Sequence, residues 1–408
     1  MRKFKWLSVL LALMLLVGLL AGCGGGDAEE PSGDNEQQAG EEANEAPKEP
    51  IKIGGIFDIT GGTGDVGAPY AEGAKAYVDY VNQNGGINGR TIDLIDIDYS
   101  YEIPQAISAY KKLVQQDKVV AILGWGTGDT EAMVEFISSD EIPYISGSFS
   151  ENLLEIDTHP YNFLIAATYS EQARIILQYI KDNWTEDRAP KVALLYNDTG
   201  FGRSPIEDAK NYAAEIGVEI VDEEIVDLSA LDATSQLLNM KSKSADFGII
   251  QETSNATATI LKDAKKLNLD TKFFGLNWTA DEISLGMAGE AAEGYIGTNL
   301  FPFPYEDISQ LTPFLEYFQG KGKSKEKLNS KHVQGWAAAQ IMLEAIKRAG
   351  DNVTGAAIKE QLEKMKGYSE GLNAPLGFTP SDHGTYEARL IQVKNGKWEK
   401  MTDWFATK

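Results

Sequence analysis

The chain has 408 residues and a formal net charge of −24, because 61 acidic side chains outnumber 37 basic ones. A chain this acidic does not supply the basic patches that bind phosphates, so we expect no nucleic-acid partner. Its single cysteine, Cys23, excludes an intramolecular disulfide and a zinc site built from several cysteines.

The first 22 residues are organised like a signal peptide. Three cations among residues 1–5 precede an apolar run over 6–20, which is too short to span a bilayer comfortably. Leu, Ala, Gly and Cys then follow and end at Cys23, an order that resembles the lipobox of bacterial lipoproteins. The resemblance implies removal of residues 1–22 and attachment of a diacylglycerol to the Cys23 thiol. An uncleaved anchor or an ordinary secretory signal is the alternative.

Residues 23–50 have the composition of a flexible linker. Nine carboxylates accompany a single cation, Lys48, and almost nothing in the segment is apolar. Such a stretch cannot bury enough surface to fold. We therefore expect a lipidated acidic linker that tethers an exported folded region, residues 51–408, to the outer face of the cytoplasmic membrane or within a periplasm. Two acyl chains suffice for stable anchoring.

From residue 51 onward, strand and helix patterns alternate. The first series predicts strands at 51–60, 91–99, 119–123 and 143–146 and helices at 70–84, 104–116 and 131–138. After an interruption at 182–190, a second series predicts strands at 192–196, 219–226, 246–251 and 272–276 and helices at 206–216, 256–267 and, later, 333–349. Strand followed by helix, repeated, indicates parallel sheets. We predict an α/β fold with two doubly wound lobes, followed by a hairpin-like stretch at 386–398.

Several short motifs carry a family resemblance that covers nearly all of the folded region. They are the glycine-rich loop after 51–60, the segments 72–74 and 84–89, and the segments 120–124, 143–150, 201–202, 294–297, 336–346 and 376–378. In order and spacing they resemble the branched-chain amino-acid-binding family of type I periplasmic binding proteins. The resemblance implies three crossings between the lobes, near Thr168, Leu300 and Gly384. Lobe 1 would then comprise 51–168 and 301–384, and lobe 2 would comprise 169–300 and 385–408.

The resemblance also implies a function. Proteins of this family catch a small solute between two hinged lobes and deliver it to a membrane permease driven by a separate ATPase. The chain is thus expected to be a monomeric solute-binding subunit of an ABC importer, with an amino acid or a related small carboxylate or amide as its ligand. The alternative is a sensor subunit that has the same two-lobed binding site and presents it to a receptor.

Two loops of lobe 1 are expected to bind the oxygen end of the ligand. Ligands of open α/β sheets lie beyond the carboxyl ends of the strands. There Gly126 lets the backbone approach, and the hydroxyls of Thr127, Ser148 and Ser150, with the free N–H groups of a helix start, can receive a carboxylate. Ordinary turns and helix caps are the alternative reading of these residues.

Aromatic residues near the strand ends are expected to contact the rest of the ligand. The candidates are Trp125 and Phe149 from lobe 1 and Phe201 and Trp278 from lobe 2. An aromatic residue at a strand end also serves often as core, which is the alternative for each of them.

Recognition of a ligand ammonium group departs from the family pattern. Relatives that bind amino acids usually place an acidic residue on the second lobe, where this chain has Asn277, and some place one at a crossover, where it has Tyr169. Glu252, beside Thr253, is the candidate replacement. Without such an acid, an aromatic or aliphatic carboxylate or a neutral amide is favoured over leucine, because an unpaired buried ammonium is costly.

The sequence contains little that supports a bound cofactor or a catalytic role. Gly62, Gly64 and Gly67 outline a dinucleotide motif, but an exported protein meets no NAD pool and no clear ribose-binding carboxylate follows at the usual distance. We therefore expect no cofactor. The only histidines, His159, His332 and His383, are scattered without metal-ligand spacing, and no GxSxG elbow is present. Paired carboxylates stay open among so many acids, yet nothing singles out two. We expect no enzyme.

Overall fold

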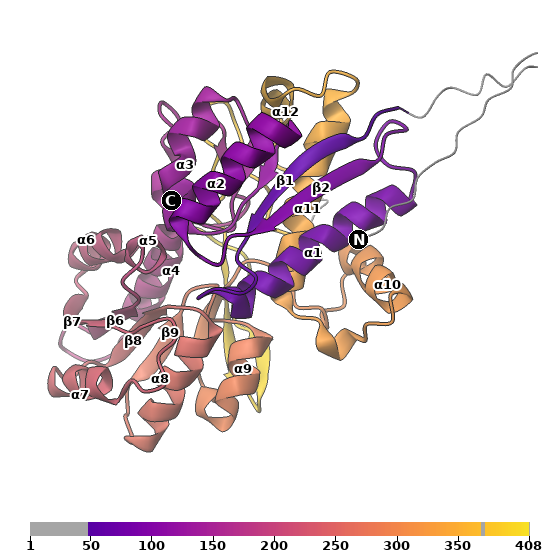
Figure 1. Cartoon of the computed structure of the whole chain (residues 1–408). Coiled ribbons are helices and arrows are strands. Elements are labelled where there is room, and N and C mark those ends of the chain that lie inside the picture. Colours follow the sequence, from indigo (N-terminus) through magenta and orange to yellow (C-terminus); the bar gives the residue numbers. More distant parts are fainter. Residues whose placement is uncertain (1–47, 369–371, 408) are drawn as a thin grey trace, which may run out of the picture. The chain divides into compact units, whose positions relative to one another are not determined.

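The computed structural model describes residues 48–368 and 372–407. The predicted signal peptide, Cys23 and most of the predicted linker lie outside the described residues. Within the described part, the chain forms two separate β-sheets flanked by helices (Figure 1). The prediction of two parallel α/β units is confirmed.

The first sheet is parallel throughout and has the strand order β2-β1-β3-β4-β5. Its strands are β1 (Ile51–Phe57), β2 (Ile92–Asp98), β3 (Ile122–Leu123), β4 (Tyr144–Ile145) and β5 (Asn162–Phe163). The helices between them are α1 (Gly64–Gln83), α2 (Ile103–Lys112), which continues into a π-helical turn, and α3 (Thr127–Ser139). The predicted strands at 119–123 and 143–146 are therefore each reduced to two residues.

The second sheet has the order β12-β11-β10-β9-β8-β6-β7. Its parallel part comprises β6 (Lys191–Tyr196), β7 (Glu219–Ile225), β8 (Phe247–Gln251), β9 (Lys272–Gly275) and β10 (Ile296–Asn299). The associated helices are α4 (Tyr169–Asp182), α5 (Gly200–Arg203), α6 (Ile206–Ile216), α7 (Thr234–Ser242), α8 (Ser254–Lys266) and α9 (Glu282–Ala288). The sequence patterns had not predicted α4, α5, α7 or α9.

The last two strands form the predicted hairpin. β11 (Arg389–Lys394) pairs antiparallel with both β10 and β12 (Lys397–Lys400). Asn395 and Gly396 between them both have positive φ, of 52° and 69°, as a two-residue type I′ turn requires. Both strands of the hairpin therefore belong to the second sheet.

Before that return, three helices pack on the first sheet's side of the protein. They are α10 (Thr312–Gly320), α11 (Ser330–Ala349) and α12 (Gly355–Leu362). α11 lies along α1 (Figure 1), and the two helices meet at glycines. A Cβ on Gly73 would lie 2.0 Å from the His332 carbonyl oxygen, and one on Gly335 would lie 1.9 Å from that of Tyr70. Only glycine permits this approach.

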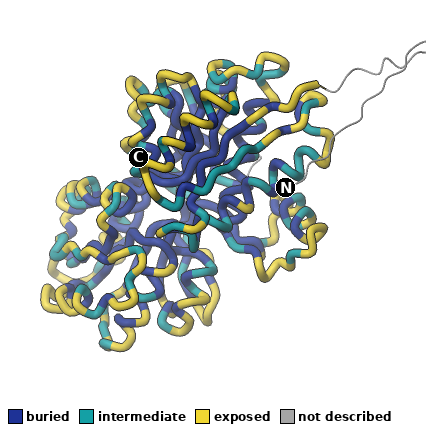
Figure 2. Tube along the Cα trace, viewed as in Figure 1, coloured by how far each residue is buried: buried dark blue, intermediate teal, exposed yellow. Residues whose placement is uncertain are grey.

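Two of the three segments in which crossings are predicted lie next to each other in the structure. Ala167 and Thr385 form an isolated parallel bridge. The two segments in which crossings near Thr168 and Gly384 are expected therefore lie next to each other. The lobe boundaries themselves stay a prediction. Buried residues run along the strands of both sheets, and exposed ones cover the outer helices (Figure 2).

The start of α1 differs from the prediction, which placed it at residue 70. Asp58, at the end of β1, accepts hydrogen bonds from the backbone N–H of Gly61 at 2.6 Å and of Thr63 at 2.8 Å. These bonds fix a turn from which the helix begins at Gly64 in spite of its glycines. A Cβ on Gly67 would lie 2.0 Å from the Asp58 carbonyl oxygen. The glycine at 67 thus allows close packing of this helix on β1.

Candidate functional site

A cavity of about 20 Å³ lies where loops from both sheets meet. Every lining residue lies just beyond the carboxyl end of a strand or at the start of the helix after it, the usual place for ligands of α/β sheets. After strands of the first sheet, the lining residues are Thr63, Val66, Tyr101, Trp125, Gly126, Thr127 and Gly147, and after strands of the second they are Phe201, Thr253 and Trp278. Tyr169 also lines the cavity, at the start of α4, which connects the two sheets. The volume holds about one water molecule. A larger solute can enter only if side chains or the two sheets move.

The cavity brings together most of the predicted ligand-binding residues. Its lining includes Trp125, Gly126, Thr127, Tyr169, Phe201, Thr253 and Trp278, whereas Ser148, Phe149, Ser150 and Asn277 lie outside it. The sequence analysis missed Thr63, Val66, Tyr101 and Gly147. Thr63 and Tyr101 follow the first two strands, and Val66 lies in the first turn of the helix after β1. The rule that ligands lie beyond strand ends therefore points to these three positions as well.

Hydroxyl groups gather at the N-terminus of α3. Gly126 is the N-cap residue, and Thr127 Oγ1 lies 2.6 Å from Ser148 Oγ. The Ser148 backbone N–H donates to Ser146 Oγ at 2.9 Å, so the loop after β4 is held against the helix start. This arrangement puts two hydroxyls and a helix N-terminus together, which suits a carboxylate.

Ser150 serves a different contact. Its Oγ accepts a hydrogen bond from Ser204 Oγ at 2.9 Å, which joins the first sheet's loop to the segment between α5 and α6. It also lies 3.3 Å from a Glu131 carboxylate oxygen. Ser150 therefore links the two sides of the cavity at its edge.

Five of the eleven residues that line the cavity are aromatic. The indoles of Trp125 and Trp278 meet edge to face, with centroids 4.9 Å apart. Both indole N–H groups are used: Trp125 donates to Thr63 Oγ1 at 2.8 Å, and Trp278 donates to Tyr169 Oη at 2.8 Å. These bonds fix the ring orientations. Phe149 lies behind the wall, stacked on Trp278 with centroids 6.4 Å apart.

Asn277 points away from this cavity. Its backbone N–H donates to Gln172 Oε1 at 2.9 Å, and the residue lines a separate cavity of about 10 Å³ together with Lys331. Neither polar atom of its side chain has a hydrogen-bond partner among the described residues. The position that aligned with the family's acidic residue is thus not at the cavity wall.

Lys331 is a buried cation behind Trp278. Its Nζ donates to the Asn277 carbonyl oxygen at 2.6 Å and lies 3.5 Å from Asp281 Oδ2 and 4.7 Å from the centroid of the Trp278 ring. Burial lowers the pKa of Lys331, while Asp281 opposes that effect. The ammonium group is already paired and is separated from the cavity by the indole.

Glu252 is buried beside the cavity without lining it. One carboxylate oxygen accepts a hydrogen bond from Asn197 Nδ2 at 3.1 Å, and the other has no partner among the described residues. Burial raises the pKa of Glu252 well above its usual range. Glu252 precedes Thr253, which does line the cavity. That Glu252 pairs with a ligand ammonium group stays a prediction.

Glu282 connects the start of α9 with that of α11. Its Oε2 accepts hydrogen bonds from Ser330 N and Oγ at 3.0 and 2.9 Å. Burial raises the pKa of Glu282 from 4.5 to about 7. Because the pKa is raised in the folded state, the cost of ionising this carboxyl is absent below pH 4.5 and complete above pH 7.

We expect Glu282→Gln to stabilise the protein at pH 7.5 but not at pH 4. Gln keeps the acceptor for Ser330 and removes the buried charge, so the stability difference from the wild type should change by up to about 3 kcal/mol between these pH values. Urea unfolding at both pH values measures it. Glu290→Gln, at a side chain that is 95% exposed, is the matched control. A difference that stays constant with pH would refute the assignment.

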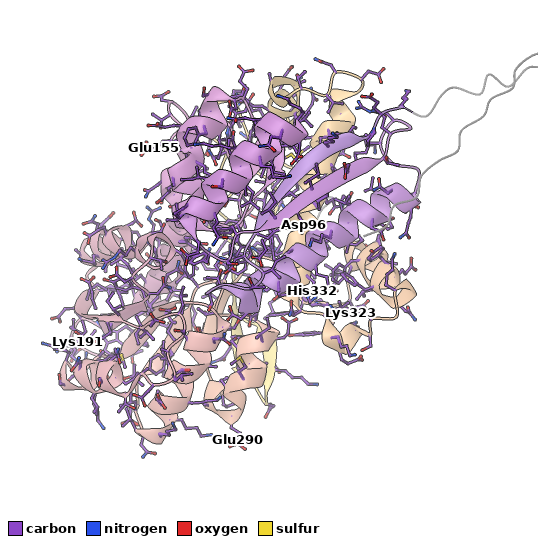
Figure 3. The ribbon with its side chains drawn as sticks, viewed as in Figure 1. Asp96, Glu155, Lys191, Glu290, Lys323 and His332 are labelled. Carbon is purple, nitrogen blue, oxygen red and sulfur yellow. The ribbon has the colours of Figure 1, made fainter. Side chains whose placement is uncertain are left out.

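The three histidines occupy separate surroundings. His332 lies beside Lys323 (Figure 3), with Nε2 3.0 Å from Lys323 Nζ and 3.3 Å from Glu72 Oε2. His383 stacks on Phe163 with ring centroids 3.9 Å apart. Within residues 48–368 and 372–407, no group of three or more His, Cys, Asp or Glu side chains could hold a metal ion.

The same described ranges contain no helix long and apolar enough to cross a membrane.

Comparison with known proteins places this geometry among similar folds. A family model described as periplasmic binding protein matches residues 50–397. The Leu/Ile/Val-binding protein homolog 7 of Brucella suis is 24% identical over 335 residues, which cover 77% of this chain and 81% of the relative. A branched chain amino acid ABC transporter from Thermus thermophilus, solved with bound valine, superposes with a TM-score of 0.83 at 28% identity, covering 88% and 97% of the two chains.

A further solved structure is similar in fold alone. The fatty acid ABC transporter substrate-binding protein from Thermomonospora curvata has a TM-score of 0.78 at 22% identity and covers 88% of this chain and 93% of its own.

Proposed function

Because the chain belongs to the periplasmic binding protein family, we propose that it captures a small amino acid or related carboxylate between its two sheets and delivers it to the permease of an ABC importer. The family consists of transporter binding proteins rather than enzymes, and its members act outside the cytoplasm. Relatives are named for binding leucine, isoleucine and valine, and one is solved with valine. These names support an aliphatic amino acid as the first candidate ligand.

One observation carries the proposal. Strand-end loops of both sheets converge on a single cavity that has hydroxyls and a helix N-terminus on one side and aromatic rings on the other. A carboxylate would bind at Thr127 and Ser148, and an apolar side chain would pack against Trp125 and Trp278. Charged hydrogen bonds of this kind contribute about 1.5 to 3 kcal/mol each, which is sufficient for micromolar capture without an arginine.

The proposal includes hinged closure of two lobes, 51–168 with 301–384 and 169–300 with 385–408. Hydrogen bonds that join their residues support it: Asp65 Oδ2 accepts from Asn255 N at 3.0 Å, and Ser150 accepts from Ser204. A ligand that touches both lobes favours the closed state through its differential affinity for that state. The small cavity volume fits a closed arrangement that must open before a solute can enter.

A thermal-shift screen of the purified full chain tests the proposed function. The screen comprises the twenty amino acids, aromatic carboxylates and small amides, because a solute that binds only the folded state must raise its stability. At a hundredfold excess over its Kd, a ligand adds about 2.7 kcal/mol. We expect a clear rise in Tm with at least one aliphatic amino acid or related acid. A flat response across all three classes would contradict the proposal.

The lipid anchor is part of the same proposal and predicts a separate result. Cys23→Ser should leave the ligand-induced Tm shift unchanged and move the processed protein from the membrane fraction to the soluble fraction, because acyl chains alone are proposed to hold it. Fractionation followed by immunoblotting measures the change. Ser32→Ala, in the same predicted linker, is the control. A processed Cys23→Ser protein that stays with the membrane would contradict lipidation.

A further inference from the structure

Lys331 contacts the second sheet's loops from a helix that packs on the first sheet's side. It lies in the first turn of α11, which runs along α1 (Figure 1). Its side chain is only 3% exposed, and its Nζ donates to the Asn277 carbonyl oxygen at 2.6 Å and lies 3.5 Å from Asp281 Oδ2. Both partners belong to the segment between β9 and α9. One buried cation thus connects α11 with the segment after β9.

A cation at this position is unfavourable in two respects. Its removal from water costs free energy, and the N-terminus of a helix carries a partial positive charge that repels it. An apolar side chain of similar volume would avoid both costs, and replacing a buried ion pair in this way is often neutral or stabilising. Stability alone therefore does not account for the lysine at position 331. Its directed contacts point to another role.

The contacts of Lys331 converge on Trp278. The ammonium lies 4.7 Å from the centroid of the indole, within the range in which an aromatic ring attracts a cation. It also bonds the carbonyl of Asn277, the residue before Trp278. The indole lines the cavity, where its N–H donates to Tyr169 Oη at 2.8 Å. Contacts from two distant parts of the chain thus determine where this part of the cavity wall lies.

Asp281 extends the same connection to a second lining segment. Its carboxylate accepts hydrogen bonds from Ser254 Oγ and Ser284 N, both at 2.7 Å. Ser254 begins α8 and directly follows Thr253, which lines the cavity. The ion pair with Lys331 therefore supports the loop after β8 as well as the loop after β9.

We propose that Lys331 is a positioning residue that fixes the Trp278 indole in the cavity wall, so that the docking of α11 sets the shape of the apolar side of the solute site. This inference rests on the proposed function, in which the apolar part of the solute packs against Trp125 and Trp278. Loss of the ammonium should then weaken binding of solutes with a large apolar side chain and spare those with a small one.

Fluorine NMR of the full chain labelled with fluorotryptophan tests the positioning without any solute. Trp278→Phe assigns the Trp278 signal. Lys331→Met keeps an unbranched side chain of similar length and removes the charge, so we expect the Trp278 signal to shift or to split. The signal of Trp184, whose ring contacts Phe247, should stay unchanged.

Two further variants keep this measurement decisive. Lys331→Met leaves Asp281 buried without its cation, so Lys331→Met combined with Asp281→Asn replaces it if the single variant fails to fold; Asn retains an oxygen that accepts a hydrogen bond. Lys321→Met is the matched control, because Lys321 pairs with Asp79 on α1. It should leave the Trp278 signal unchanged.

Isothermal titration calorimetry shows whether the effect on binding acts through the indole. The probes are L-leucine and L-alanine. Lys331→Met should weaken leucine binding about tenfold, the size of a desolvated cation–ring contact, and leave alanine binding within about twofold. In the Trp278→Phe background the same substitution should change leucine affinity by less than about threefold, because residues that act through one contact are not additive. A merely structural defect would lower both affinities together, in either background.

The outcomes separate the positioning role from the proposed function. A Trp278 signal that neither shifts nor splits in the Lys331 variants would overturn the positioning role and leave the solute-binding role intact. An equal loss of leucine affinity with and without the Trp278→Phe substitution would also overturn it. A shifted Trp278 signal together with a flat thermal-shift screen would support the contact between Lys331 and Trp278 and overturn the proposed function.

Discussion

Replacing Thr127 and Ser148 together by alanine is expected to weaken ligand binding by at least about a hundredfold. Each hydroxyl is proposed to donate to the ligand carboxylate, and a hydrogen bond to a charged group contributes about 1.5 to 3 kcal/mol. The double variant is the cleaner test because the two hydroxyls bond each other at 2.6 Å, so a single replacement leaves the other without its partner. Titration calorimetry with the solute that gives the largest Tm shift measures the loss.

Stability of the ligand-free protein is the accompanying readout. Removing both members of a hydrogen-bonded pair costs little, and the further loss is the 3.2 Å bond from the Ser150 backbone N–H to Ser148 Oγ. The ligand-free Tm should therefore fall by only a few degrees. A matched control is Ser242→Ala combined with Thr259→Ala, two hydroxyls that bond backbone carbonyls and do not line the cavity. If the Thr127/Ser148 variant loses as much stability as affinity, these hydroxyls are structural caps and the carboxylate binds elsewhere.

Gly335→Ala is expected to destabilise the protein by about 3 kcal/mol or more. The new Cβ would lie 1.9 Å from the Tyr70 carbonyl oxygen, which is backbone and cannot rotate away, so α1 and α11 would have to separate. Overpacking of an interior typically costs about 1 to 3 kcal/mol, and more where the backbone must shift. Urea unfolding of the full chain measures the difference.

Gly320→Ala provides the control for that substitution. Gly320 ends α10, and nothing lies within 4 Å of its added Cβ. Alanine at such a position leaves stability unchanged or raises it slightly, by about 0.5 to 1 kcal/mol. Equal stabilities of Gly335→Ala and the wild type would show that the two helices adjust freely, and would contradict the close crossing.

The sequence predicted the fold well where a local pattern determines the structure. Apolar runs identified β1 and β8, and the Asn395–Gly396 pair identified the terminal hairpin, because these signals depend on few neighbours. β3 and β4 are shorter than their apolar runs because sheet pairing, rather than composition, sets where a strand ends. The early start of α1 depends on Asp58, whose side chain fixes the preceding turn.

The candidate site was predictable in its loops and not in its charge partners. Glycines and hydroxyls at strand ends indicated Gly126 and Thr127, both of which line the cavity, and their contact with a ligand stays a prediction. Asn277 lines a different cavity, and its backbone N–H donates to Gln172 Oε1, so its predicted contact with the ligand stays a prediction. Asp65 lies 190 positions before Asn255, its hydrogen-bond partner, and no local pattern reveals a contact over that separation.

The sequence patterns also could not predict which ionisable side chains are buried. Lys331 and Asp281 lie 50 positions apart and come together only because α11 packs against the start of α9. In sequence both have the appearance of ordinary surface charges in an acidic chain. Asp65, Glu252 and Glu282 each keep a buried carboxylate oxygen that has no hydrogen-bond partner among the described residues.

A crystal structure of the full chain grown with the solute that stabilises it most is the most direct test of capture between the two sheets. The account predicts the solute in an enlarged form of the cavity, with a carboxylate oxygen at hydrogen-bond distance from Thr127 Oγ1 and Ser148 Oγ. Its apolar part should lie against Trp125 and Trp278. A solute bound instead in the groove of about 580 Å³ beside Phe247 and Tyr295, at the opposite ends of the second sheet's strands, would contradict the central claim.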